Sequence, residues 1–169
     1  GPQGVRNDTR STMFPCGIAA AAAWDRALVR DYGRALGQDC RARGVHILLG
    51  PGVNIYRSPL CGRNFEYYSE DPLLSGKCGA AMVRGIQSQG VGTSVKHFAA
   101  NNQESMRLQN DARVSQRALR EIYLRGFEIA VKEGRPWTVM SSYNRINGPY
   151  TQESRELLTT VLHDEWGYE

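Results

Sequence analysis

A lysine and a histidine stand side by side in the stretch SVKHFAANNQE, residues 94–104, at the end of a short β-branched run. A cation at the end of a buried strand has to meet a carboxylate, carbonyl oxygens or a ligand, because an unpaired buried charge is costly. Lys96 and His97 could therefore serve catalysis, ligand binding or structure. For His97 alone, a core histidine bonded to the backbone is as good an interpretation as a ligand contact.

Further polar side chains lie in two other long loops. Arg63 belongs to GPGVNIYRSPLCGRNFEYYSED, residues 50–71, and Tyr143 belongs to SSYNRINGPY, residues 141–150. Taken singly, a loop arginine is usually a surface ion pair, and the tyrosine could be plain packing. Taken together, side chains of the Arg, Lys, His, Asn and Tyr kinds suit a polyhydroxylated ligand, since every hydroxyl needs a donor or an acceptor.

Composition and missing motifs argue against several other classes. The 169 residues, 41% hydrophobic and 22% charged, fit one domain, and the net charge of +4 is not gathered in a basic patch. We therefore expect no nucleic-acid partner and, without an apolar run of about 18 residues, no membrane span. We also expect no metal and no cofactor, because the four cysteines form no CxxC pair and phosphate-binding motifs are absent. No signal peptide is recognisable, so the compartment stays open.

Helix and strand signals alternate along the chain. Four helices are expected, at Asp25 to Gly44, Asp71 to Gly90, Ser115 to Gly134 and from near Thr151. Four short apolar runs are expected to be strands, at 18–23, 46–49, 93–95 and 138–140. This alternation predicts an α/β fold with parallel strands and about four βα units. The long loops follow the strand ends, where such sheets collect their binding residues.

Three long motifs then show a resemblance to a known family. The stretches GPGVNIYRSPLCGRNFEYYSEDP, GIQSQGVGTSVKHFAANNQE and VMSSYNRING occur in the order found in glycoside hydrolase family 3, and they resemble its β-glucosidase branch. The likeness runs from GPQGVR at residue 1 to WGYE at residue 169. It implies a TIM-type (β/α)8 barrel, of which residues 1–169 would be an internal part of the N-terminal barrel domain.

The resemblance also implies an activity and a set of site residues. The activity is retaining hydrolysis of terminal, non-reducing β-D-glucosyl residues, without a metal or cofactor. Arg63, Lys96 and His97 would bind sugar hydroxyls. Arg107 and Tyr143 would approach the nucleophile, and Met140 would line the pocket. The complete implied set of substrate-binding residues is Arg63, Lys96, His97, Arg107, Met140 and Tyr143.

The two ends of the chain give a further expectation. In the family an Asp precedes GPQGVR, the nucleophilic Asp comes shortly after WGYE, and the general acid lies in the next domain. We therefore expect no catalytic residue in this chain, with the nucleophile just beyond Glu169. Glu66 and Glu70 would hold the long loop instead. The remainder of the parent chain would be needed to complete the site, and the 169 residues alone would be inactive.

Two alternatives stay open. Within the family, the parent could be a β-xylosidase or another exo-glycosidase, although KHFAANNQE favours a β-glucosidase that acts on a β-glucoside or an oligosaccharide. N-acetylglucosaminidases of the family carry a His-containing loop that this sequence lacks. Outside catalysis, the chain could be a sugar-binding fragment that works through Arg63, Lys96 and His97.

Overall fold

The structure, a computed structural model, describes residues 3–6 and 10–169, so the start of the GPQGVR motif lies outside the described residues. From the N-terminus the first elements are α1 (Gly17–Ala22), α2 (Arg26–Ala42), β1 (Ile47–Leu48), η1 (Asn64–Glu66), α3 (Pro72–Gln87), β2 (Gly92–Phe98) and β3 (Asp111–Ala112). They are followed by α4 (Gln116–Ala118), η2 (Leu119–Tyr123), α5 (Arg125–Ile129), η3 (Ala130–Gly134), β4 (Thr138–Ser141), β5 (Arg145–Ile146), η4 (Thr151–Glu153) and η5 (Glu156–Glu165).

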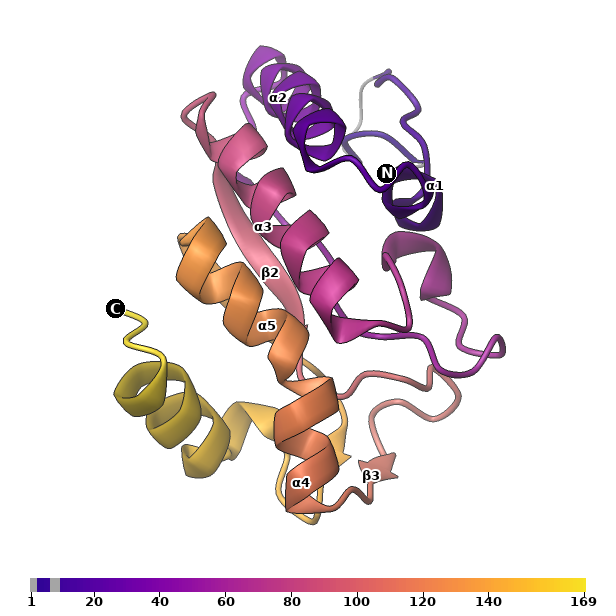
Figure 1. Cartoon of the computed structure of the whole chain (residues 1–169), viewed down its shortest axis with the longest axis vertical. Helices are drawn as coiled ribbons and strands as arrows, with labels where there is room; N and C mark the ends of the chain where they lie inside the picture. Colours follow the sequence, from indigo (N-terminus) through magenta and orange to yellow (C-terminus); the bar gives the residue numbers. More distant parts are fainter. Residues whose placement is uncertain (1–2, 7–9) are drawn as a thin grey trace.

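A parallel sheet forms the centre of the fold. Its strand order is β1-β2-β4, with Ile47 opposite Gly92 and Ser94 opposite Thr138. The helices α2, α3 and α5 lie side by side over one face of this sheet, in front of β2 in Figure 1. The predicted α/β class with parallel strands is therefore confirmed. A second, two-stranded parallel sheet of β3 and β5 was not predicted.

The helix starts follow from capping side chains. Asp25 accepts hydrogen bonds from two backbone N–H groups of α2, and Asp71 accepts one from Leu73 at the start of α3, where Pro72 fills the first turn. Ser115 caps the helical segment from α4 to η3 in the same way. That segment ends where Arg135 adopts a left-handed conformation with φ of 54°. These predicted helices are confirmed.

Two expectations about the strands are wrong. Residues 18–23 were expected to form the first strand, but most of them belong to helix α1 (Gly17–Ala22). The run is mostly alanine, the strongest helix former, so helix propensity outweighs its apolar character. The described sheet thus has three parallel strands rather than four. Lys96 and His97 also lie inside β2, not in the loop after it, because the strand continues to Phe98.

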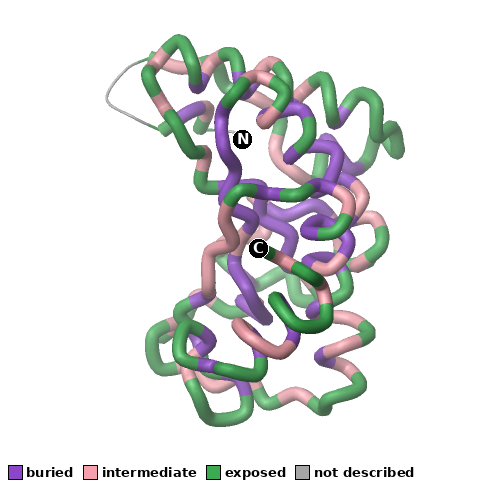
Figure 2. The backbone as a smooth tube through the Cα atoms, turned by 90° about the vertical axis from the view of Figure 1, so that its left-hand side faces the viewer, coloured by how far each residue is buried: buried purple, intermediate pink, exposed green. Residues whose placement is uncertain are grey.

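The core fills the space between the sheet and its helices. Figure 2 shows the buried segments gathered in the middle of the molecule, with exposed ones on the outer helix faces. Phe98 of β2 is fully buried and packs edge-on against Phe127 of α5, with ring centroids 5.3 Å apart. Residues on α3, including Val83 and Ile86, are buried against the same core. This core fixes the position of β2, which carries the Lys–His pair.

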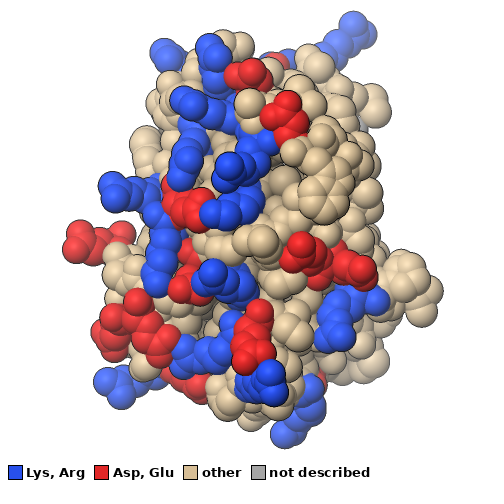
Figure 3. Space-filling view, in the orientation of Figure 1, with Lys and Arg blue, Asp and Glu red and all other residues tan. Residues whose placement is uncertain are grey.

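The charged residues are interspersed over the helical surface. Figure 3 shows Lys and Arg beside Asp and Glu across the face that the helices form. Glu128, for example, lies 2.6 Å from Arg125 and 2.9 Å from Lys132 on one helix face. These pairs fit the expectation of solvated helix surfaces. No described helix combines the length and the apolar character that crossing a membrane requires.

Candidate functional site

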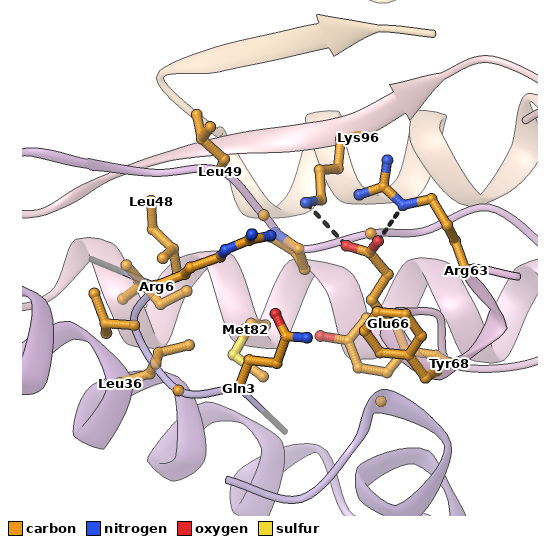
Figure 4. Close-up of a pocket in the computed structure, with 18 of the residues that line it drawn as sticks. Gln3, Arg6, Leu36, Leu48, Leu49, Arg63, Glu66, Tyr68, Met82 and Lys96 are labelled. Carbon is orange, nitrogen blue, oxygen red and sulfur yellow. Dashed lines mark hydrogen bonds and ion pairs between the residues drawn. The ribbon is translucent and has the colours of Figure 1, made fainter. Parts of the chain in front are cut away.

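A cavity of about 820 Å³ opens beside β1 and the end of β2. Figure 4 shows that it has an apolar part, where Leu36, Leu48 and Met82 lie, and a polar part around Lys96, Arg63 and Glu66. Glu104 and Arg107 from the loop after β2 also line it. A cavity with an apolar wall and a few converging polar groups is typical of a small-molecule site.

Glu66 joins the two cations at the polar end. Its Oε2 lies 2.9 Å from Nζ of Lys96, and its Oε1 accepts a hydrogen bond from Nε of Arg63. The short helical turn η1 places Arg63 and Glu66 three residues apart on one side, while Lys96 arrives from β2. The side chains are only 13% (Lys96), 17% (Glu66) and 23% (Arg63) exposed. Glu66 thereby holds two cations, from separate segments, at the cavity.

The charge state of Glu66 follows from its surroundings. Burial by itself would raise the pKa of its carboxyl group, but the hydrogen bonds and charges of Arg63 and Lys96 together lower that pKa below its ordinary value. The group is therefore an ionised carboxylate at neutral pH. The prediction that Glu66 holds the long loop fits its pairing with Arg63, and the link to Lys96 adds a contact with the central sheet.

His97 is held by its backbone and by one side-chain contact. The amide of Asn54 accepts a hydrogen bond from the backbone N–H of His97 at 2.7 Å and donates one to its carbonyl at 3.0 Å. Nδ1 of the ring lies 3.0 Å from the hydroxyl of Tyr67. Burial, and then the charges of Arg63 and Lys96, lower the pKa of His97 to about 3. The imidazole is therefore neutral at physiological pH.

A hydrogen-bond chain connects His97 to the other side of the site. Nδ2 of Asn101 lies 3.0 Å from the Tyr67 hydroxyl and 3.0 Å from Oε1 of Glu104. Oε2 of Glu104 in turn accepts from Nη1 of Arg107 at 3.0 Å. The Arg107 guanidinium lies over the ring of Tyr143, 4.9 Å from its centroid. The loop after β2 and the loop after β4 therefore meet at this site.

The structure separates the six predicted residues into two groups. Arg63, Lys96 and Arg107 line the cavity. The other three are not among its lining residues: His97 is buried, Met140 is half-buried in β4, and Tyr143 is 51% exposed beneath Arg107. For all six residues, contact with a sugar stays a prediction. Within residues 3–6 and 10–169, no group of three His, Cys, Asp or Glu side chains could hold a metal ion.

Sequence reasoning missed the residues that connect these groups. Asn54, Tyr67, Asn101 and Glu104 received no role. Asn54 and Tyr67 contact His97, Glu104 contacts Arg107, and Asn101 connects Tyr67 with Glu104. One signal could have pointed to them: all four lie in the same motif stretches as Arg63 and Lys96. The arrangement presents cations and a neutral imidazole, and the two carboxylates among the described cavity residues, Glu66 and Glu104, are held in ion pairs. It is suited to holding hydroxyl groups rather than to attacking a bond.

The neutrality of His97 has a measurable consequence for stability. The unfolded chain binds a proton at this histidine below pH about 6.5, whereas the folded chain does so only near pH 3. Folding stability should therefore fall as pH is lowered from about 6.5 to about 3, with a contribution of up to about 1.4 kcal/mol per pH unit. Urea unfolding of the unmodified protein and of His97→Gln across this pH range measures the contribution of His97.

The charged groups that act on the ring are Arg63, Lys96 and Arg107, which disfavour its protonation, and Glu66, which favours it. Glu66 also loses its own stabilising pairing at acidic pH, but His97→Gln keeps that carboxylate, so the difference between the two proteins reports on His97. His46→Gln, which replaces an exposed histidine, is the control. A His97→Gln variant with the same pH slope as the unmodified protein would contradict the assignment.

Comparison with known proteins extends over nearly the whole chain. The model of the glycosyl hydrolase family 3 N-terminal domain matches residues 2–169. Thermostable β-glucosidase B of Acetivibrio thermocellus is 57% identical over 162 residues, which cover 96% of this chain and 22% of that protein. An exo-α-(1→6)-L-arabinopyranosidase of Bifidobacterium breve is 50% identical over 182 residues, covering 100% of this chain and 24% of that protein.

Solved structures give the same picture. β-Glucosidase 3B from Thermotoga neapolitana in complex with glucose matches with a TM-score of 0.96 and 55% identity, over 100% of this chain and 25% of that one. A family 3 β-glucosidase of Bifidobacterium adolescentis matches with a TM-score of 0.97 and 54% identity, also over 100% and 25%. The chain spans about a quarter of the length of these relatives.

Proposed function

The chain belongs to glycoside hydrolase family 3, and on that premise we propose that it forms an internal part of the N-terminal barrel domain of a retaining, exo-acting β-glucosidase. Its parallel βα units are part of a TIM-type barrel. The substrate would be a terminal, non-reducing β-D-glucosyl residue of a β-glucoside or oligosaccharide. Hydrolysis by a pair of carboxyl groups would need no cofactor.

The observation that carries the proposal is the paired group of cations at the polar end of the cavity. Arg63 and Lys96 are fixed by one carboxylate, with the neutral His97 beside them on the same strand as Lys96. Ionised donors make hydrogen bonds to sugar hydroxyls that are about twice as strong as neutral ones. Fixed donors of this kind stabilise a transition state without reorganising during the reaction. Arg107, Met140 and Tyr143 complete the proposed set of sugar contacts.

We place the catalytic carboxyl groups outside these 169 residues. Retaining hydrolysis needs a nucleophilic carboxylate and an acid–base group on opposite sides of the glycosidic bond. The carboxylates that line the cavity, Glu66 and Glu104, are both engaged with cations, which suits them to positioning. The nucleophilic Asp would follow Glu169, and the rest of the parent protein would complete the site. The chain would then supply a large share of the sugar-binding residues.

One alternative within the family has a specific observation behind it. The Bifidobacterium breve relative named for L-arabinopyranose is 50% identical to this chain, close to the identities of the β-glucosidases. The matched segment therefore does not separate a hexose from a pentose. A β-xylosidase or another exo-glycosidase remains the second candidate, and a sugar-binding fragment without catalysis remains the third.

The test compares the intact protein, meaning the parent protein that contains these residues, with the 169-residue chain. We expect the intact protein to hydrolyse an aryl β-D-glucoside with a higher kcat/KM than an aryl β-D-xyloside or an aryl α-L-arabinopyranoside, and with retention at the anomeric carbon. We expect the 169-residue chain to hydrolyse none of them. Initial rates and the anomer first released, followed by NMR, give both results.

Each opposite result has a distinct meaning. Turnover by the 169-residue chain would show that it carries its own catalytic groups. If the intact protein prefers the xyloside or the arabinoside, the proposed β-glucosidase activity is wrong and the protein is another family 3 exo-glycosidase. If the intact protein hydrolyses none of the three substrates although circular dichroism shows that it is folded, the proposal that it is a glycoside hydrolase is contradicted.

A further inference from the structure

The hydroxyl of Tyr67 lies at the centre of the hydrogen-bond chain beneath the polar end of the cavity. The side chain is fully buried, and its hydroxyl lies 3.0 Å from both Nδ1 of His97 and Nδ2 of Asn101. The next link is Glu104, whose carboxylate contacts Asn101 and Arg107 at 3.0 Å each. The chain thus runs from a cation that lines the cavity to the imidazole beside Lys96.

We propose that Tyr67 is a positioning residue that fixes His97 in the tautomer carrying its proton on Nε2, so that this N–H is the donor which the ring offers to a substrate hydroxyl. The proposal rests on the proposed sugar-binding role of His97 and deepens it by assigning the direction of one hydrogen bond. Tyr67 acts through the histidine and does not itself line the cavity.

The first step is the orientation of the Asn101 amide. A carboxylate only accepts hydrogen bonds, so the atom of Asn101 that faces Glu104 has to be the nitrogen. Turning the amide over would bring its oxygen against the carboxylate, two acceptors face to face. Arg107 keeps Glu104 in place from the other side. The contact of Asn101 with Tyr67 therefore also comes from the nitrogen, which donates to the hydroxyl.

The second step follows for the tyrosine proton. The Tyr67 oxygen accepts from Asn101, and its own hydrogen is free for the other neighbour, Nδ1 of His97. Burial raises the pKa of the Tyr67 phenol, so the hydroxyl keeps its proton. Nδ1 is then an acceptor. In a neutral imidazole the other nitrogen has to carry the hydrogen, and the ring is neutral here.

The third step concerns where the remaining donor points. In the described part of the chain, Nε2 of His97 makes no hydrogen bond, yet it is not among the buried polar atoms without a partner. Nε2 is therefore the ring nitrogen left for a ligand, on a residue that is only 4% exposed. The charges of Arg63, Lys96 and Arg107 all act on the ring. A single directed donor among these cations suits an oxygen atom with free lone pairs.

The tautomer can be read directly from the nitrogen chemical shifts of the histidine rings. We would label the intact protein with [15N]histidine and assign His97 by its loss in His97→Gln. We expect the Nε2–H tautomer for His97 at pH 8. His163 is an internal reference with the opposite expectation, because its Nδ1 contacts the carbonyl of Tyr168, which can only accept.

Two variants test the cause. In Tyr67→Phe we expect a mixture of both tautomers and a fall in kcat/KM of about tenfold. Asn101→Asp, combined with Glu104→Gln so that two carboxylates do not meet, places an acceptor opposite the tyrosine, draws the hydroxyl proton away from His97 and should favour the Nδ1–H tautomer. The matched control is Tyr56→Phe, which removes a hydroxyl bonded to the carbonyl of Tyr68 in the same loop and should change neither readout.

The outcomes separate this proposal from the proposed function. An Nδ1–H tautomer in the unmodified protein, or a tautomer unchanged both in Tyr67→Phe and in the double variant Asn101→Asp with Glu104→Gln, overturns the role of Tyr67. If Tyr67→Phe does not fold, the tautomer of the unmodified protein still tests whether Nε2 of His97 carries the proton. If the tautomers follow expectation but the intact protein hydrolyses no aryl glycoside, the proposed function is wrong and the positioning of His97 stands.

Discussion

Replacing Glu66 by alanine in the intact protein is expected to lower kcat/KM for the aryl β-D-glucoside by at least about a hundredfold. This corresponds to a loss of about 2.7 kcal/mol of transition-state stabilisation. The carboxylate holds Arg63 and Lys96 in place, and all three side chains are less than a quarter exposed. Without it, two largely buried cations would face each other unpaired. Removing one partner of a buried ion pair typically costs 3–5 kcal/mol of stability.

The experiment separates positioning from simple loss of folding. Steady-state kinetics and urea unfolding would be measured for Glu66→Ala, for Glu66→Gln and for the control Glu70→Gln. Glu70 was expected to hold the same loop, but it is exposed and makes no ion pair or side-chain hydrogen bond within the described residues, so its replacement should change neither quantity. Glu66→Gln keeps the shape and should show an intermediate loss of activity. Kinetics within twofold of the unmodified protein in Glu66→Ala would contradict the role of the carboxylate.

Local signals predicted most of the helices and the sheet. Asp25 and Asp71 as caps, Pro72 in the first turn and the end near Gly134 all depend on neighbours within a few residues, so the sequence contains them. The strand predicted at 18–23 was wrong because a short apolar run does not distinguish helix from strand by periodicity. There the alanine content, a local signal as well, decided for helix α1.

The candidate site was less accessible to sequence reasoning. The residue types of Arg63 and Lys96 indicated a polar pocket, but their common partner Glu66 joins a loop to a strand 30 residues further on. The contacts of Asn54 and Tyr67 with His97 span 43 and 30 residues. Such contacts depend on how loops pack after the sheet has formed. The sequence could therefore name the cations that line the cavity, but not the contacts of Glu66 with Lys96 or those of Asn54 and Tyr67 with His97.

Replacing Phe98 by alanine should also have a large effect on stability. The ring is fully buried and makes edge-on contacts with Phe127 at 5.3 Å and Trp166 at 5.8 Å. Phe→Ala changes in cores usually cost 3–5 kcal/mol, because apolar contacts are lost and a cavity remains. The same residue follows His97 directly, and its carbonyl accepts a hydrogen bond of 2.8 Å from Ser142. A shift of β2 here would move Lys96 and His97.

Phe98→Ala is therefore expected to lower the free energy of unfolding by about 3–5 kcal/mol. Phe98→Leu keeps most of the side-chain volume and should cost less than about half of that free energy. The two variants therefore compare a large and a small cavity at the same position. Urea unfolding measures both, and kcat/KM at a temperature where each variant is folded shows whether Lys96 and His97 have moved. Equal stability of the two variants would mean that the core collapses around the smaller residue. Full activity in a folded Phe98→Ala protein would show that the loop contacts of Asn54 and Glu66 hold the pair without the aromatic core.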